Sequence, residues 1–161
     1  MLKVFQLRAA RSTLGLGVRD IGAYIDLSRS AISKIEREGL TSALKIKEDQ
    51  NIILIKIFND KGVFFPDNNS VCYGLNSKSY NSYLTRFQLR GGRAILGLSQ
   101  REMSEIVNIE KNILNYLENL TNASPLYNGE KVQESVNVTL RDFFYENNIS
   151  FPTESTIKIK S

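Results

Sequence analysis

The apolar residues of a short stretch near the N-terminus, DIGAYIDLSRSAISKIE, are spaced as they are in two amphipathic helices. Ile21 and Ile25 lie on one face of the first expected helix, and Ile32 and Ile35 lie on one face of the second. The acidic residue Asp26 lies between the two segments and acts as the expected hinge. The stretch therefore predicts two short helices that pack their apolar faces against each other.

The same pattern recurs 82 residues later in the chain. FQLRAARSTLGLGVRD aligns with FQLRGGRAILGLSQRE, and ten of the 32 aligned positions from residue 5 to residue 36 are identical. Asp26 and Asn108 occupy the same place between the two short helices, where we expect the left-handed backbone conformation that Gly, Asn and Asp tolerate best. A repeat on this scale indicates two copies of one unit. We therefore expect two tandem domains, 1–74 and 83–161, joined by the polar linker 75–82.

Each copy continues with a longer apolar segment and then reaches an aromatic–proline pair followed by β-branched residues, which predicts a helix and a β-hairpin. The expected elements are helices at about 2–14, 18–25, 29–38 and 43–61 with a hairpin at 63–74, and helices at about 80–96, 100–107, 111–119 and 129–147 with a hairpin at 149–160. The offset of GVFFP from NISFP is 86, so we place four extra residues in the NLTNASPLY loop of the second copy. The expected fold is mainly α-helical, with two small hairpins.

Helix ends are indicated by small polar residues and glycines. Ser28, Ser42 and Asn128 are expected N-caps, because their short side chains can accept hydrogen bonds from the first free amides of a helix. Gly15 and Gly97 are expected to end the first helix of each copy. A strand over NIILIKIF remains an alternative to a helix there, since β-branched residues dominate that stretch.

Composition narrows the classes of function. The chain has no histidine and a single cysteine, Cys72, which removes the commonest general base, multi-cysteine metal sites and intrachain disulfides. We expect no catalysis, no metal and no cofactor. The longest aliphatic run, Ile52 to Ile55, is far shorter than the roughly 20 residues of a membrane span, and no secretory signal opens the chain, so we expect a cytoplasmic protein.

Charge is divided unequally between the copies. The net charge of the chain is +4, and all of this excess lies in residues 1–82. The stretch 28–37 carries three basic residues and one acidic residue, whereas 110–119 carries one basic and two acidic residues. The first copy is therefore the better candidate for a polyanionic partner.

The repeated pattern resembles the lambda repressor-like, Cro-type helix-turn-helix of the xenobiotic-response-element family over residues 5–40 and 87–122. The first copy supplies the family pattern with Asp20, Ile21, Gly22, Asp26, Leu27, Ser28, Ile32, Ser33 and Glu36. The second supplies Glu102, Met103, Ser104, Asn108, Ile109, Glu110, Leu114, Asn115 and Glu118. The first copy departs chiefly at Asp26, where Gly is usual, and the second departs also at Glu110 and Asn115.

The resemblance implies two structural ion pairs. In the family, the arginine four residues before the glycine of the LGL motif pairs with the glutamate that ends the recognition helix. The corresponding pairs here are Arg11 with Glu36 and Arg93 with Glu118. Removing one partner of a buried pair costs about 3 to 5 kcal/mol, so we assign these four residues to the scaffold.

The resemblance also implies DNA contacts, because the recognition helix enters the major groove while the preceding helix lies across the phosphates. The expected base-reading residues are Arg29, Ser30, Ser33 and Lys34 in the first copy and Lys111, Asn112 and Tyr116 in the second. The expected contacts to the DNA backbone are Thr13, Arg19, Ser28, Arg37, Gln100 and Arg101. The alternative for the basic residues is a solvated helix face. For the second copy, base reading and pairing with another protein surface are both open, because its recognition helix carries net negative charge.

The expected function is a sequence-specific regulator of transcription, of prokaryotic or phage type, that binds double-stranded DNA mainly through helix 29–38. We expect a homodimer built by the fourth helices, at 51–58, and by the hairpins, whose edge strands would otherwise be unpaired. RNA polymerase is open as a further partner, since repression and activation both suit this fold. The competing class is an adaptor or antitoxin that uses a helix-turn-helix scaffold to bind a partner protein.

Overall fold

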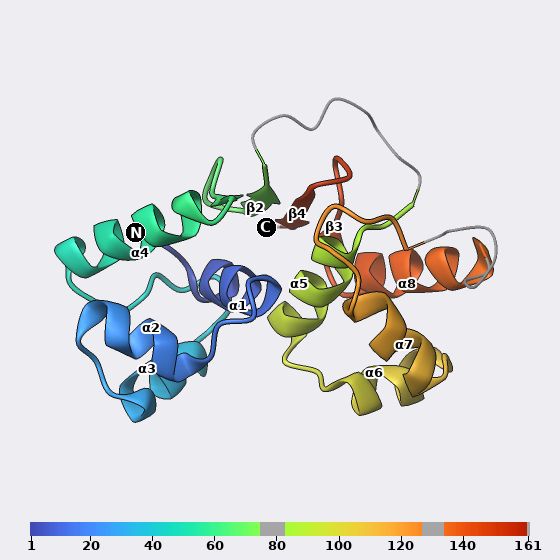
Figure 1. The fold of residues 1–161 in the computed structure, drawn as a ribbon, viewed down its shortest axis with the longest axis horizontal. Coiled ribbons are helices and arrows are strands. Elements are labelled where there is room, and N and C mark those ends of the chain that lie inside the picture. Colours follow the sequence, from blue (N-terminus) through green and yellow to red (C-terminus); the bar gives the residue numbers. More distant parts are fainter. Residues whose placement is uncertain (75–82, 127–133, 161) are drawn as a thin grey trace.

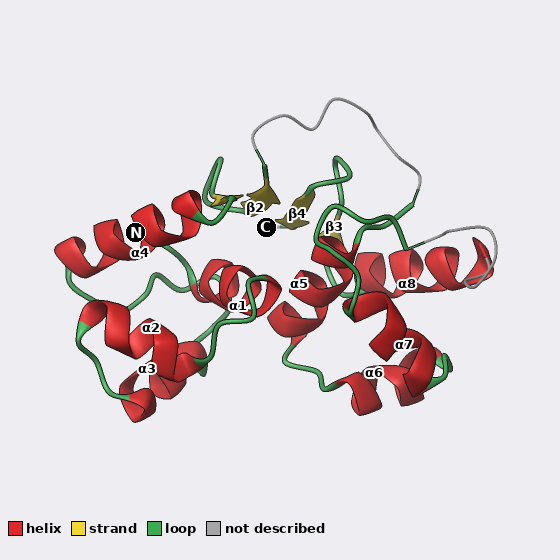
Figure 2. Cartoon of the chain, in the orientation of Figure 1, coloured by secondary structure: helices red, strands yellow, loops and turns green. Residues whose placement is uncertain are grey.

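The computed structural model describes residues 1–74, 83–126 and 134–160. In these residues the fold is mainly α-helical, with one small antiparallel sheet of four strands (Figures 1 and 2). The first half consists of α1 (Val4–Thr13), α2 (Val18–Ile25), α3 (Arg29–Glu36), α4 (Glu48–Asp60), β1 (Val63–Phe64) and β2 (Ser70–Tyr73). The second half consists of α5 (Arg86–Leu96), α6 (Gln100–Val107), α7 (Lys111–Glu118), α8 (Glu134–Glu146), β3 (Ile149–Ser150) and β4 (Thr156–Ile159).

The fourth helix begins later than the pattern predicted. It starts at Glu48 and not at 43, because the preceding segment pairs with the N-terminal segment: the Phe5 amide donates to the Leu40 carbonyl at 3.0 Å and the Leu44 amide to the Leu2 carbonyl at 2.8 Å. Ser42 is therefore not an N-cap, which is Lys47. The stretch NIILIKIF lies within α4, so the alternative of a strand is wrong. The expected cap Asn128 and the expected linker 75–82 lie outside the described residues.

Both short helix pairs contain the left-handed turn that the sequence predicted. Asp26 has φ of 54° and Asn108 has φ of 53°, and each ends the first helix of its pair. Gly22, in the helix before the first of these turns, leaves no room for a side chain. A Cβ added there would lie 2.3 Å from the Leu27 carbonyl oxygen. At the equivalent position Ser104 donates its Oγ to the Ile109 carbonyl at 2.6 Å, so the second copy uses a hydrogen bond where the first uses a glycine.

Contacts within the two halves repeat residue for residue. Gln6 donates from Nε2 to the carbonyls of Asp67 and Ser70, and Gln88, 82 residues later, donates to the carbonyls of Thr153 and Thr156. The offset of 82 still holds at Leu126, whose amide bonds to Leu84 as that of Leu44 bonds to Leu2. At Asn137 the offset between the copies has become 86 residues. The Asn137 Oδ1 accepts from the Leu84 amide, just as the Asn51 Oδ1 accepts from the Leu2 amide. The four extra residues therefore lie between Leu126 and Asn137, at or beyond the end of the NLTNASPLY loop (119–127) in which the sequence placed them.

The two hairpins join into one sheet with the strand order β1-β2-β4-β3. At its centre β2 pairs antiparallel with β4, and Val71 lies opposite Ile157. These two residues are equivalent in the repeat, because they stand 86 positions apart. The neighbouring residues follow the same symmetry: Ser70 faces Lys158, and their equivalents in the repeat, Thr156 and Cys72, face each other. A pseudo-two-fold axis therefore passes between Val71 and Ile157.

The first helices of the two halves, α1 and α5, pack against each other beneath this sheet (Figure 1). They meet at another equivalent pair: a Cβ added at Gly91 would lie 3.8 Å from the Ala9 Cβ, 3.3 Å from a Thr13 methyl group and 2.4 Å from the Ile157 Cδ1. The small side chains let the helices approach closely under the central strands. Buried residues of both halves form one continuous hydrophobic core. The inner hairpin edges, which we expected to face a second chain, are thus paired within one chain.

Candidate nucleic-acid interface

The two helix pairs α2–α3 and α6–α7 lie on the same side of α1 and α5, opposite the sheet (Figure 1). In the first pair, α3 begins at the expected cap Ser28, whose Oγ accepts from the Ala31 amide at 3.1 Å. Ile32 and Ile35 are buried on the inner face of α3. The opposite face is exposed to solvent, so this helix presents a free surface at the edge of the molecule.

The residues expected to read bases in the first copy lie on that free surface. The side chains of Arg29, Ser30 and Lys34 are exposed, and that of Ser33 is half-buried. Arg37 follows at the C-terminal end of α3, exposed, with its Nε donating to the Ser33 carbonyl at 3.2 Å. Among the described residues none of these three cations forms a salt bridge, although, after the larger effect of Lys45, the charge of Lys34 contributes to the lowered pKa of Glu38. They leave α3 with a positive outer face.

The last residue of α3, Glu36, is held by Arg11 of α1. The guanidinium donates from Nε to Glu36 Oε1 at 2.7 Å and from Nη2 to Oε2 at 2.8 Å. Its third nitrogen, Nη1, donates to the Leu16 carbonyl at 3.1 Å. A two-bonded arginine–carboxylate pair fixes orientation as well as distance. Arg11 therefore locks α3 to α1 and to the turn that leads into α2.

The second copy contains the same lock. Arg93 donates from Nε and Nη2 to the two carboxylate oxygens of Glu118, at 2.8 and 2.5 Å, and from Nη1 to the Leu98 carbonyl at 2.7 Å. This pair is more deeply buried than the first, because the Glu118 side chain is 2% exposed and the Glu36 side chain 11%. Both ion pairs implied by the sequence are thus formed, and α7 is held as firmly as α3.

The outer face of α7 differs in chemistry from that of α3. Lys111 and Asn112 are exposed and Tyr116 is half-buried, so the expected residues do lie at the surface. Glu110 caps the helix without a side-chain hydrogen bond. On the neighbouring helix α6, Ile106 is 57% exposed. Because Glu118 is neutralised by Arg93, the exposed charges of α7 and its cap cancel, and its surface is more apolar than that of α3.

The expected contacts to the DNA backbone do not all lie at the surface. Ser28, Arg19 and Arg101 are exposed, although Arg101 pairs with Glu105 at 3.2 Å, and Gln100 is half-buried at the start of α6. Thr13 is 2% exposed, and its Oγ1 donates back to the Ala9 carbonyl at 2.8 Å. The expectation that Thr13 meets DNA was wrong, because α5 covers the end of α1.

A basic hollow that the sequence did not indicate lies between the two halves, next to α3. It has a volume of about 350 Å³, and its lining includes Arg8, Arg11, Arg37, Arg93 and Glu36. Two of these arginines neutralise Glu36 and Glu118, whereas Arg8 and Arg37 bond only to backbone carbonyls and keep their charge uncompensated. The positive surface of α3 therefore continues toward the pseudo-two-fold axis.

Arg8 and Arg86 connect the two halves through equivalent carbonyl groups. Arg8 donates to the Glu36 carbonyl of its own half and, at 3.1 Å, to the Ile95 carbonyl of the other. Arg86 donates to the Glu118 carbonyl at 3.0 Å and to the Thr13 carbonyl at 2.7 Å. Glu36 and Glu118 are equivalent in the repeat, as are Thr13 and Ile95. Each arginine thus ties the end of α3 or α7 to the end of the central helix of the opposite half.

The side chain of Arg86 is half-buried. Burial lowers the pKa of its guanidinium from the ordinary value, and the nearby charge of Arg90 acts in the same direction. An arginine keeps its proton in proteins nonetheless, so both charges persist along the contact of α1 and α5. Arg90 bonds to Ser12 Oγ at 3.4 Å and, like Arg86, forms no salt bridge in the described parts of the chain, although the charge of Glu118 acts on Arg86 and opposes the lowering of its pKa.

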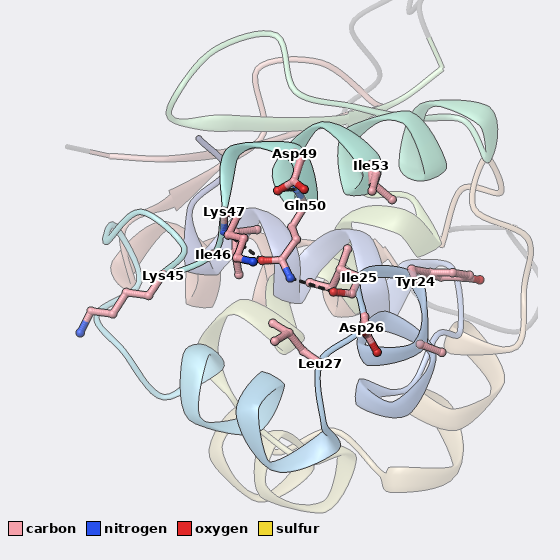
Figure 3. Close-up of a pocket in the computed structure, with 11 residues that line it drawn as sticks. Tyr24, Ile25, Asp26, Leu27, Lys45, Ile46, Lys47, Asp49, Gln50 and Ile53 are labelled. Atoms are coloured by element: carbon pink, nitrogen blue, oxygen red, sulfur yellow. Dashed lines mark hydrogen bonds between the residues drawn. The ribbon is translucent and has the colours of Figure 1, made fainter.

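A larger open groove of about 720 Å³ lies on the other side of the α2–α3 turn (Figure 3). Gln50 crosses its floor, since its Nε2 donates to the Ile25 carbonyl at 2.8 Å and its Oε1 accepts from the Lys47 amide at 2.9 Å. These bonds tie the end of α2 to the start of α4. Lys45 extends away from the groove and pairs with Glu38 at 2.9 Å. We assign this groove to the support of the α2–α3 pair.

The described residues give little support to other kinds of functional site. No group of three or more His, Cys, Asp or Glu side chains that could hold a metal ion occurs there. In the same part of the chain, no helix is long and apolar enough to cross a membrane. Cys72 is buried in β2, and burial raises the pKa of its thiol, which lowers the fraction of reactive thiolate.

Comparisons of the chain with models of protein families, with curated proteins and with solved structures find no significant match. We therefore interpret the interface from its own residues. Its defining features are the positive face of α3, the locked ends of α3 and α7, and the shared side on which both helices lie.

Proposed function

We propose that the protein binds double-stranded DNA in a sequence-specific way through α3 and regulates transcription, with α2–α3 and α6–α7 acting as two helix-turn-helix units of the Cro type. The observation that carries this proposal is the exposed row of Arg29, Lys34 and Arg37 on a helix whose end is fixed by Arg11 and Glu36. A recognition helix needs a rigid scaffold behind it and free donors in front. The geometry of α3 supplies both.

The positive hollow beside α3 supports the same proposal. Phosphate neutralisation supplies most of the affinity of proteins for DNA, and Arg8 and Arg37 add uncompensated charge where the backbone would pass beside a helix in the major groove. Occlusion of a promoter would give repression, and contact with RNA polymerase from a bound site would give activation. We propose regulation without choosing between these two outcomes.

A second candidate function is supported by the surface of α6–α7. The exposed Ile106 and the balanced charges of Glu110 and Lys111 suit a protein partner better than a phosphate backbone. In this candidate the chain is an adaptor or antitoxin that binds another protein with its helix-turn-helix scaffold. The charge of α3 favours DNA for the chain as a whole.

Selection of duplexes from a random pool by the full chain tests the proposal. We expect an enriched sequence whose binding weakens steeply as salt rises, because several cations displace counterions from the phosphates. A pool that shows no enrichment, together with salt-insensitive capture of one protein partner, would favour the adaptor. Lys34→Ala serves as the matching variant, since its side chain is exposed and its loss leaves the core intact.

A further inference from the structure

We infer that one chain carries both reading helices of a two-fold arrangement and binds, as a monomer, a duplex with two unlike half-sites. The inference rests on the proposed function and deepens it, because it states the form of the DNA site and the number of chains on it. It differs from the homodimer expected from the sequence. The observations that support it are the internal symmetry axis, the unequal residues that the axis relates, and the arginines that fix the two halves.

The axis passes through two independent contacts. Val71 faces Ile157 in the sheet, and Ala9 meets Gly91 between the central helices, and in each contact the partners are equivalent in the repeat. This is the signature of an isologous interface, the kind that relates two subunits of a symmetric dimer. Helix-turn-helix dimers use such an interface to present two recognition helices to one face of DNA. Here the interface is internal, and α3 and α7 take the two places (Figure 1).

The interface removes the part that the hairpin edges were expected to play in a homodimer, although Ile52 and Ile53 of α4 stay exposed. The inner edges of the hairpins, β2 and β4, are consumed by their pairing with each other. The space beside Gly91 is already occupied by the side chains of Ala9, Thr13 and Ile157 of the same chain. A second copy could therefore not use these surfaces without opening the core. The chain is complete as a two-fold reader.

The two reading positions are chemically unlike. The axis relates Arg29 to Lys111, Ser30 to Asn112 and Lys34 to Tyr116. In a homodimer both helices are identical, so the preferred site is a palindrome. Arginine and lysine pair best with guanine O6 and N7, whereas asparagine pairs with adenine N6 and N7. We therefore expect a guanine-containing half-site under α3 and an adenine-containing half-site under α7.

The spacing of the half-sites is fixed by the same structure. Arg8 and Arg86 join the ends of α3 and α7 to the central helices of the opposite half, so the two reading helices cannot move apart without breaking these bonds. The centres of half-sites on one face of DNA lie about 10 base pairs apart. We expect binding to fall when one or two base pairs are inserted between them.

The mass of the full chain bound to an enriched duplex tests the stoichiometry, measured by light scattering on a sizing column. We expect one chain per duplex. Scrambling either half-site should weaken binding, and the α3 half-site should matter more because its helix carries more charge. Asn112→Ala should reduce affinity for the intact duplex roughly tenfold, because it removes one bidentate contact to a base. On a duplex whose α7 half-site is scrambled, that contact is already absent, so the same substitution should leave affinity unchanged.

Asn68→Ala, in the exposed turn between β1 and β2, is the matched control and should bind as the unaltered chain does. Two chains on one palindromic duplex would overturn the inference and restore the homodimer. Binding that ignores every base of one half-site would overturn it as well, and would leave α7 to a protein partner. An absence of any enriched duplex would instead contradict the proposed function itself, so the two failures are distinguishable.

Discussion

Val71 and Ile157 face each other across the centre of the sheet although 86 residues separate them along the chain. Each is the other's equivalent in the repeat, and their pairing, with that of Ala9 and Gly91 below, turns two copies of one unit into a single symmetric fold. The symmetry relates α3 to α7 and places both at the same side of the molecule (Figure 1).

Gly91→Ala should destabilise the protein. The added methyl group would lie 2.4 Å from Ile157 Cδ1 and 3.3 Å from a Thr13 methyl group, and overpacking of this kind costs about 1 to 3 kcal/mol, against a gain of about 1 kcal/mol in helix propensity. Chemical denaturation measures the free energy of unfolding. Gly39→Ala is the control, because its methyl group would meet only the side-chain oxygen of the exposed Ser42. Equal stability of the two variants would contradict close packing of α1 against α5 at Gly91.

Glu118→Ala should destabilise the protein more than Glu36→Ala. Both remove a carboxylate from a two-bonded arginine, but Glu118 is more deeply buried, so Arg93 is left with less access to water. The loss at Glu118 should approach about 3 kcal/mol, the lower end for a buried pair. Glu105→Ala removes an exposed pair with Arg101 and should change the free energy of unfolding by less than about 1 kcal/mol. The reverse order of these three losses would contradict the assigned roles.

Much of the local structure could be predicted from the sequence. The helices α2 and α6 have the predicted bounds, and Asp26 and Asn108 adopt the predicted left-handed conformation, because both features depend on neighbours within a few residues. The residues of α3 that were expected to read bases also lie at the surface, with Ser33 half-buried. The repeat supplied a second, independent instance of each of these local patterns.

The joining of the halves could not be predicted. It depends on contacts between residues more than 70 positions apart, such as Arg86 with Thr13, for which neither periodicity nor composition gives a signal. The same contact explains why Thr13 was misplaced at the DNA. The late start of α4 has a similar cause, because Leu44 is held by Leu2 in an extended segment that a helical pattern does not reveal.

Lys34→Ala should weaken binding to the enriched duplex by roughly 5- to 100-fold while the free energy of unfolding stays the same. The side chain is exposed on α3, so its loss removes a donor and no packing. Gel-shift titration at fixed salt gives the dissociation constant. Lys56→Ala removes a cation of the same type on α4, where it pairs with Asp60, and should leave binding unchanged. Equal losses for the two variants would indicate a nonspecific effect of net charge.

Arg37→Ala should reduce the salt dependence of binding. The guanidinium lies at the basic hollow and faces solvent, so we assign it to a backbone phosphate rather than to a base. Loss of one phosphate contact lowers the slope of log affinity against log salt by about 1. Titrations at several salt concentrations, with cognate and random duplexes, measure the slope. An unchanged slope with altered base preference would move Arg37 to the reading set.

Cys72 should react slowly with thiol reagents in the native protein and report the opening of the sheet. It lies in β2 opposite Thr156, and its raised pKa means that thiolate is scarce below that pKa and increases as pH rises through it. Labelling should therefore accelerate with pH and with mild denaturant. Bound duplex should slow it, because binding to the folded state stabilises that state. Rapid labelling under native conditions would contradict a closed junction between β2 and β4.

A hydroxyl-radical footprint of the full chain on an enriched duplex tests the central claim most directly. The account predicts two protected stretches about one helical turn apart, produced by a single chain and unlike in sequence. Loss of protection at only one stretch with Lys34→Ala, and at only the other with Asn112→Ala, would assign each to its helix. A full chain that protects no duplex, or that protects a single stretch only, would contradict the account.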